Sequence, residues 1–168
     1  MRRSVPWFVL AAVIVAVDQL VKGLVLARFA PGEGLEVTGF FNLVLVFNKG
    51  AAFSFLAGQA GWQTPLLVAF ALVAAAIVSV LIVRNPGKRL LCAGLAAVLG
   101  GALGNVIDRL RFGHVVDFLD FHAGLLDFYP FYKHFPAFNV ADSAITIGAA
   151  LLILEGFGFH EKRAGASS

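Results

Sequence analysis

The chain is poor in charged residues and almost lacks cysteine. Only 14% of its 168 residues are Asp, Glu, Lys or Arg, whereas 60% are hydrophobic. Soluble domains are nearer half apolar and a quarter charged, so this composition excludes an ordinary soluble domain and predicts an integral membrane protein. The single cysteine, Cys92, excludes an internal disulfide and argues against a cysteine-based metal site.

Neither the histidines nor the net charge indicates a bound metal or a nucleic-acid partner. The four histidines are scattered at positions 114, 122, 134 and 160, and none has the i, i+4 partner of a helical zinc site. We therefore expect no metal and no cofactor. The formal net charge is only +3, and the basic residues gather at the chain ends and in one loop. We interpret them as topology signals and expect no nucleic-acid partner.

Four apolar segments are long enough to cross a bilayer, which takes about 20 residues. They run over about 5–26, 65–83, 90–109 and 140–159. The sequence thus predicts one membrane-embedded domain over residues 1–168, an all-α integral membrane protein with four transmembrane helices. Residues 35–48 are rich in Val, Phe and Leu and are broken by Gly39, which predicts one or two short strands of a small extracytoplasmic β-sheet. Residues 118–138 are expected to form an interfacial loop.

Basic residues divide the connections between these helices into two sides. One side holds the residues before the first helix, the link between the second and third, and the residues after the fourth. These segments carry Arg2, Arg3, Arg84, Lys88, Arg89, Lys162 and Arg163. By the positive-inside rule this side faces the cytoplasm. We therefore expect a multi-pass protein whose two termini are cytoplasmic.

The unusual polar residues fall at the opposite, outer level of the four helices. They are Asp18, Lys22, Asn105, Asp108, Arg109, Asp117, Asn139 and Asp142. Charged groups are costly near a bilayer and tend to sit there for a functional reason. Two neighbouring carboxyls can divide general acid and general base roles on water, because they share one proton. Asp117 and Asp142 are therefore the candidate catalytic pair, and sequence does not say which of them holds the proton.

Structural interpretations compete with these assignments. Asp142 lies three residues after Asn139, as in a helix-capping box, and an acid in a first helical turn suits the helix dipole. Asp117 can be read as an ordinary interfacial carboxylate. Asp18 and Lys22 are i, i+4 neighbours, so an internal ion pair explains them as well as substrate contact does.

Two other functions are alternatives on physical grounds. Intramembrane Asp and Lys also mark transport pathways, so a small ion-coupled carrier is possible. A carrier would place its polar groups near the midplane and show paired repeats, whereas these groups crowd one edge. Ser54 and Ser143 would suit a serine hydrolase, but neither lies in a nucleophile elbow or near an evident histidine base. Gly100-x-x-x-Gly104 favours close packing of the third helix.

Five motifs along the chain resemble those of one known family. They are Asp18-Gln19-x-x-Lys22, Asn48-x-Gly50-Ala51-Ala52-Phe53-Ser54, Gly104-Asn105-x-x-Asp108-Arg109-Leu110, Val115-Val116-Asp117-Phe118 and Phe138-Asn139-x-Ala141-Asp142-Ser143. Their order and intervals are similar to those of lipoprotein signal peptidase, or signal peptidase II, over nearly the whole chain. This family consists of bacterial inner-membrane aspartic peptidases with four transmembrane helices. They remove signal peptides from prolipoproteins whose cysteine carries a diacylglyceryl group.

The resemblance implies an aspartic endopeptidase that cleaves before the lipidated cysteine. Asp117 and Asp142 would be catalytic, at the extracytoplasmic face of the bacterial inner membrane. The positions that would support the site or the substrate are Asp18, Lys22, Asn48, Gly50, Asn105, Asp108, Arg109 and Asn139. The implied partners are prolipoproteins carrying diacylglyceryl-cysteine and membrane lipids, with the enzyme a monomer. The run 118–138 is longer than is usual for the family, which bears on the lid beside the site.

Overall fold

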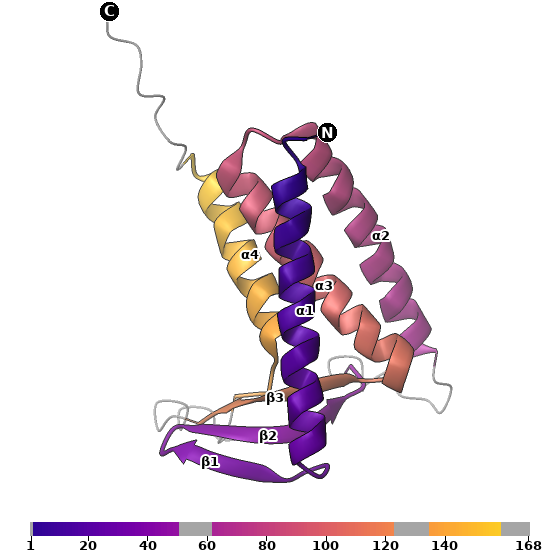
Figure 1. Cartoon of the computed structure of the whole chain (residues 1–168), viewed down its shortest axis with the longest axis vertical. Helices are drawn as coiled ribbons and strands as arrows, with labels where there is room; N and C mark the ends of the chain where they lie inside the picture. Colours follow the sequence, from indigo (N-terminus) through magenta and orange to yellow (C-terminus); the bar gives the residue numbers. More distant parts are fainter. Residues whose placement is uncertain (1, 51–61, 123–134, 159–168) are drawn as a thin grey trace, which may run out of the picture.

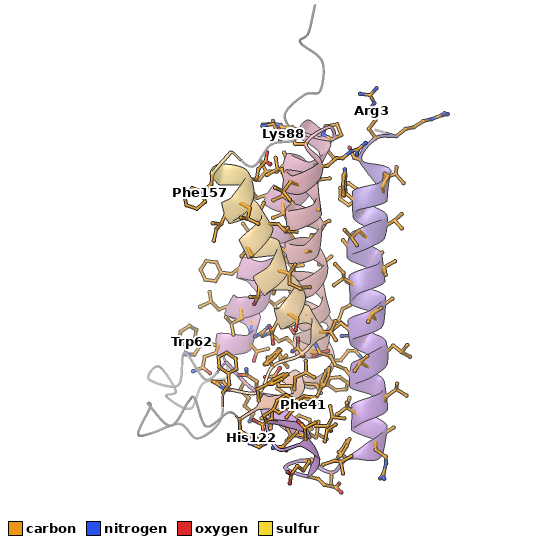
Figure 2. All side chains as sticks on the ribbon, turned by 90° about the vertical axis from the view of Figure 1, so that its left-hand side faces the viewer. Arg3, Phe41, Trp62, Lys88, His122 and Phe157 are labelled. Atoms are coloured by element: carbon orange, nitrogen blue, oxygen red, sulfur yellow. The ribbon has the colours of Figure 1, made fainter. Side chains whose placement is uncertain are left out.

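A computed structural model of the chain describes residues 2–50, 62–122 and 135–158. In these residues four helices stand side by side, and a small sheet lies across one end of them (Figure 1). The helices are α1 (Val5–Arg28), α2 (Gln63–Arg84), α3 (Arg89–Phe112) and α4 (Val140–Gly156). The start of α1, the end of α4 and the α2–α3 link lie away from the sheet (Figure 1). Figure 2 shows Arg3 and Lys88 at that end, and Phe41 and His122 at the sheet end.

Three of the helices, α1, α2 and α3, are long and apolar enough to cross a membrane. Helix α4 has 17 residues, which at about 1.5 Å per residue gives roughly 25 Å, against a hydrocarbon core of about 30 Å. It also ends at Gly156, earlier than the expected residue 159. Gly158 follows with φ +77°, a left-handed conformation that stops a helix and that glycine adopts without strain. The described residues therefore contain three helices of spanning length and a shorter fourth.

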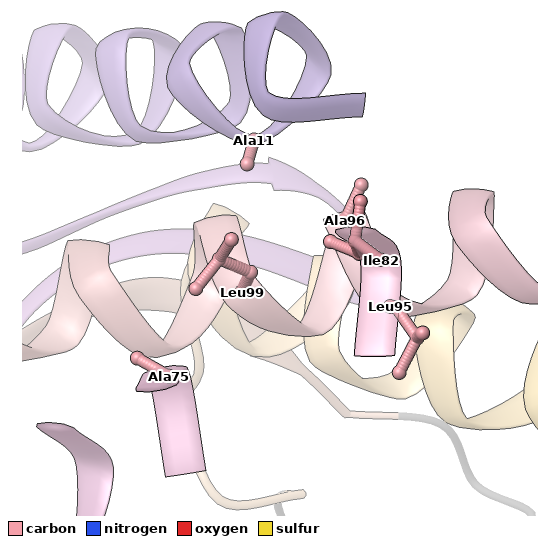
Figure 3. Packing of buried hydrophobic residues seen from close by; sticks show 6 residues of the cluster. All are labelled: Ala11, Ala75, Ile82, Leu95, Ala96 and Leu99. Carbon is pink, nitrogen blue, oxygen red and sulfur yellow. The ribbon is translucent and has the colours of Figure 1, made fainter. Parts of the chain in front are cut away.

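Helix α3 is the centre of the bundle, packed against the other three helices. Its small residues allow close approach, as the glycine spacing predicts. A Cβ on Gly100 would lie 2.8 Å from the Ala11 carbonyl oxygen of α1, and one on Gly104 would lie 2.7 Å from Oδ2 of Asp18. Towards the end away from the sheet, alanine and leucine side chains of α3 form a buried cluster with Ala11 of α1 and with α2 (Figure 3).

The sheet has three antiparallel strands in the order β1 (Gly34–Thr38), β2 (Phe41–Asn48) and β3 (Val115–Phe121). The expectation of one or two strands over 35–48 is met by β1 and β2. The expectation of a loop from residue 118 is wrong for its first residues, because β3 continues to Phe121. Strand β3 escaped the sequence pattern because it is covered on both sides, so its apolar residues and its aspartates do not alternate cleanly. Residues 123–134 of the expected loop lie outside the described part.

One face of the sheet packs under the end of α1. Val116 and Phe118 of β3 join Leu45 of β2 and Val25 of α1 in a buried cluster. The Leu119 N–H and the Phe138 N–H each donate to the other's carbonyl oxygen, at 2.8 and 3.0 Å, immediately before α4 begins. This pairing ties the start of α4 to β3. It therefore places the two candidate aspartates, one in β3 and one in the first turn of α4, at the same end of the bundle.

Candidate active site

The first turn of α4 is held by a reciprocal cap. Asn139 is the N-cap, and its Oδ1 accepts the Asp142 N–H at 2.9 Å, while Oδ2 of Asp142 accepts the Asn139 N–H at 3.3 Å. The capping interpretation of Asp142 is therefore correct. The cap occupies only one oxygen of the Asp142 carboxyl, and the other oxygen, Oδ1, accepts a hydrogen bond from the Asn105 amide at 2.8 Å. Asp142 is only partly buried.

Asp117 faces the same cap from β3. Its Oδ1 accepts from Nδ2 of Asn139 at 2.7 Å, and its Oδ2 accepts from Nδ2 of Asn48 at 3.0 Å. The residue is 1% exposed, which does not fit an ordinary carboxylate in interfacial water. Because Asn139 bonds to both aspartates, one buried side chain joins Asp117 and Asp142 into a single network.

Lys22 of α1 lies behind this network at the centre of a buried charge cluster. Its Nζ lies 2.8 Å from Oδ2 of Asp18 and 2.7 Å from Oδ2 of Asp108, and all three residues are at most 2% exposed. The predicted Asp18–Lys22 ion pair is therefore present, and Asp108 extends it. Lys22 gives a third hydrogen bond, at 3.1 Å, to Oδ1 of Asn105.

The two carboxylates of the cluster also hold the backbone beside the candidate pair. Oδ1 of Asp18 accepts the N–H of Ala141 at 2.9 Å, and Oδ2 of Asp108 accepts the N–H of Val116 at 3.1 Å. Ala141 and Val116 are the residues immediately before Asp142 and Asp117. The cluster therefore fixes the chain at both aspartates without touching their carboxyls.

Gln19 belongs to this cluster, although the sequence analysis did not select it as a site residue. Its Nε2 donates to Oδ1 of Asp108 at 2.8 Å, to Oδ2 of Asp18 at 3.2 Å and to the Gly104 carbonyl at 3.2 Å. Gln19 therefore bridges the two carboxylates that also flank Lys22. The signal was available, because Gln19 is the second residue of the Asp18-Gln19-x-x-Lys22 motif.

Gly50 and Arg109, both predicted as supporting residues, lie at the border of the network. Gly50 has φ +97°, a conformation open to glycine, and its N–H donates to Oδ1 of Asn48 at 2.8 Å. This bond turns the amide nitrogen of Asn48 towards Asp117. Nη1 of Arg109 donates to the Asn105 carbonyl at 3.4 Å, and its guanidinium interacts electrostatically with Asp142 and, less strongly, with Asp117.

The surroundings of Asp117 change its acidity. Burial raises the pKa of Asp117 from its usual 3.8 to about 6, and the negative charge of Asp142 acts in the same direction. The amides of Asn48 and Asn139 and the charge of Lys22 oppose the rise without cancelling it. Two carboxyls in one network, one of them hard to ionise, are the arrangement that general acid–base hydrolysis needs.

Other chemistries find less support among the described residues. No group of three or more His, Cys, Asp or Glu side chains is arranged there to hold a metal ion. Oγ of Ser143 donates to the Asn139 carbonyl at 2.9 Å and so serves the helix cap. Ser54 lies outside the described residues.

Comparison with known proteins identifies the family. The family described as signal peptidase (SPase) II matches residues 10–158. Lipoprotein signal peptidases of Paraburkholderia phytofirmans and Ralstonia nicotianae are each 53% identical over 150 residues, which is 89% of this chain and 83% of theirs. A solved structure of a bacterial membrane enzyme superposes with a TM-score of 0.76 at 28% identity, covering 92% of this chain and 94% of that one. The chain therefore belongs to the signal peptidase II family.

Proposed function

We propose that Asp117 and Asp142 are the catalytic pair with which this membrane aspartic peptidase removes signal peptides from prolipoproteins. The observation that supports the pair is the Asn139 side chain, which hydrogen-bonds to Asp117 through Nδ2 and to the first turn of α4 at Asp142 through Oδ1. The raised pKa of Asp117, about 6, is the second support, because the carboxyl stays protonated to a higher pH than an ordinary aspartate and can donate that proton.

The reaction proceeds in two steps on a water molecule held by the pair. The ionised carboxyl takes a proton from the water as its oxygen attacks the scissile carbonyl carbon, and the neutral carboxyl donates its proton to the carbonyl oxygen. A neutral tetrahedral intermediate results. When it collapses, the C–N bond breaks, the leaving nitrogen takes up a proton from one carboxyl, and one hydroxyl of the intermediate returns its proton to the other carboxyl, leaving a carboxylic acid product. The pair ends with one proton, as it began, so no other co-reactant is consumed.

The substrate in this proposal is a prolipoprotein whose cysteine carries a diacylglyceryl group, cut just before that cysteine. The site lies where the helices meet the sheet, and the sheet and its β1–β2 turn carry exposed apolar side chains suited to acyl chains or lipid. These side chains are Leu35, Val37, Phe40, Val46 and Phe47. The prolipoprotein and the surrounding lipids are the partners, and the proposed enzyme is a monomeric single domain over residues 1–168.

The proposed location is the bacterial inner membrane, with α4 as a fourth span beside α3. Arg2, Arg3, Arg84, Lys88 and Arg89 flank the ends of α1, α2 and α3 away from the sheet, so both termini and the α2–α3 link would be cytoplasmic and the catalytic pair extracytoplasmic. A cysteine placed at residue 87 in a Cys92→Ala background tests this. It should resist a membrane-impermeant thiol reagent in intact cells and react after lysis, and labelling in intact cells would reverse the orientation.

A carrier is not favoured as an alternative. Its coupling residues would need to exchange partners during transport, whereas Asp18, Lys22 and Asp108 are buried and fully paired. Cleavage itself is the direct test. Purified protein in detergent or lipid should shorten a diacylglyceryl prolipoprotein at the bond before the modified cysteine, and should do so much more slowly on the same precursor without the lipid. Equal rates on the two precursors would remove the lipid requirement from the proposal.

A further inference from the structure

Two buried amides approach the catalytic pair in orientations that their other partners fix. An ammonium group has three donors and no acceptor, so the group that faces Nζ of Lys22 must be the oxygen of Asn105. The amide nitrogen of Asn105 then points at Oδ1 of Asp142. The Asp142 backbone N–H fixes Asn139 in the same way, because it requires the oxygen of that side chain and leaves the nitrogen for Asp117.

The two aspartates then differ in what surrounds them. Asp142 is partly exposed, sits in the first turn of α4 at the positive end of the helix dipole, and accepts from both an amide and a backbone N–H. Asp117 is 1% exposed and lies in a strand, which has no such dipole. The hydrogen bonds that Asp117 accepts from the side-chain amides of Asn48 and Asn139 do not cancel the rise in its pKa that burial causes.

The charged groups around the pair act on both members. From α1, Lys22 is joined to Asp142 through the Asn105 amide and its charge also acts on Asp117, where it does not cancel the effect of burial, while Asp18 is neutralised by Lys22. From α3, Asp108 is likewise paired with Lys22, and Arg109 interacts more strongly with Asp142 than with Asp117. The charge that each aspartate feels from the other disfavours ionisation of both, so the environment decides which one ionises first.

We propose that Lys22 is a positioning residue which, by orienting the Asn105 amide, makes Asp142 the ionised member of the pair. Asp142 then takes the proton from the attacking water, and Asp117 carries the shared proton and donates it to the scissile carbonyl oxygen. The proposal rests on the function proposed above. It adds the division of labour within the pair and the route, through Lys22 and Asn105, by which α1 sets that division.

A matched pair of variants tests this through the pH profile of kcat/KM. Asn105→Leu removes a donor from Asp142, so the acidic limb should move up by roughly 1 pH unit, the size of one lost hydrogen bond to a charged group. Asn48→Ala removes a donor from Asp117, so the alkaline limb should move up by a similar amount. Ser79→Ala, which removes a hydroxyl bonded to Ala75 within α2, is the control and should move neither limb. The opposite assignment of limbs, or movement of both limbs in both variants, would overturn the proposal.

A spectroscopic measurement keeps the test independent of turnover and of how well Asn105→Leu folds. Infrared spectra of protein with ¹³C-labelled aspartate report the carbonyl band of a protonated carboxyl. In Asp142→Asn, where Asp117 remains buried, the band should persist above the usual carboxyl pKa of 3.8, because burial still raises the pKa of Asp117. In Asp117→Asn the band should be absent at the same pH, and its presence there would overturn the assignment. If the wild type failed to cleave prolipoprotein, the proposed function would fall while these spectra still reported the asymmetry.

Discussion

Two groups of carboxylates lie side by side at the sheet end of the bundle, and they are built differently. Asp18 and Asp108 flank a buried lysine, and each also accepts a backbone N–H. In the part of the chain that the structure describes, no cation lies within hydrogen-bonding distance of Asp117 or Asp142, and neutral amides join the two. In the first group, Lys22 balances the negative charges and the carboxylates hold the backbone. In the second group, no direct cation among the described residues balances the charge, and the proposed mechanism has the two carboxyls share one proton.

The comparison teaches that burial alone does not decide what an aspartate does in this protein. Asp18, Asp108 and Asp117 are all essentially inaccessible to water. Removing one partner of a buried ion pair costs stability because the other charge is left alone. Replacing Asp117 or Asp142, whose side-chain hydrogen-bond partners are neutral amides, is expected to lower turnover instead of stability.

The largest expected effect is on turnover. Asp117→Asn and Asp142→Asn should each lower kcat by at least about 10²–10⁴-fold, the range for losing a general acid or base, because an amide can neither accept nor share the water's proton. The double variant should be scarcely slower than either single variant, since the two residues act as one unit. Kinetics on purified variants measure this. Near wild-type turnover in either single variant would reduce that aspartate to a cap or a structural group.

The largest expected effect on stability comes from Lys22→Met. The change leaves Asp18 and Asp108 buried without their cation, and breaking such a pair costs about 3–5 kcal/mol. Unfolding in detergent, followed by heat or denaturant, measures the loss. Lys88→Met at the exposed start of α3 is the matched control and should change stability little. If the two variants unfolded alike, the cluster would not be the structural element described.

A pH-dependent effect should distinguish Asp117 from the compensated carboxylates. Its pKa is higher in the folded protein, about 6, than the usual 3.8, so the folded state binds a proton more tightly. The resulting stabilisation is complete below about pH 3.8 and is lost as the pH rises through 6, by an order-of-magnitude total of about 3 kcal/mol. Across that pH window, the melting temperature should depend less steeply on pH in Asp117→Asn than in the wild type. Identical slopes would contradict the raised pKa.

A smaller effect is expected at Gln19. Gln19→Leu removes the amide that bridges Asp18 and Asp108 but leaves Lys22 in place, so the expected cost is about 1–3 kcal/mol, typical of hydrogen bonds to charged groups. Part of the turnover should remain, because neither catalytic carboxyl loses a direct partner. Ser79→Ala serves as the control within the bundle. Complete loss of activity in a stable Gln19→Leu protein would show that Gln19 acts in the chemistry.

The smallest expected effect is that of a chelator. The proposed reaction uses two carboxyls and water, so EDTA should leave the rate unchanged. The assay needs only the wild-type enzyme and a lipidated precursor. Loss of cleavage in EDTA that zinc restores would point to a metallopeptidase, and the comparison between the two groups of carboxylates would then lose its meaning.

Much of this arrangement was predictable from the sequence, because it depends on long apolar runs and on local spacing. The four helices, the Asp18–Lys22 ion pair, the Asn139–Asp142 cap and the close packing at Gly100 all follow from residues a few positions apart. Strand β3 and the role of Gln19 did not follow. Both depend on neighbours far along the chain: β3 pairs with β2 about 70 residues earlier, and Gln19 bonds to Asp108.

The orientations of the two amides were also beyond sequence reasoning. Asn105 and Asn139 were predicted only as supporting residues, and the spacing of a motif does not say which atom of an amide faces which partner. Lys22 and the Asp142 N–H settle that in the folded protein. The unequal roles proposed for Asp117 and Asp142 therefore depend on contacts among α1, α3, β3 and α4.

The most direct test of the central claim compares Asp117→Asn with Asp18→Asn, measuring turnover and unfolding on the same preparations. The account predicts that Asp117→Asn stays folded in the membrane and loses turnover. It predicts that Asp18→Asn, which breaks the contact with Lys22 but keeps an oxygen for the Ala141 N–H, unfolds more easily and retains partial turnover. If Asp18→Asn were as inactive as Asp117→Asn while equally stable, the division between structural and catalytic carboxylates would be contradicted.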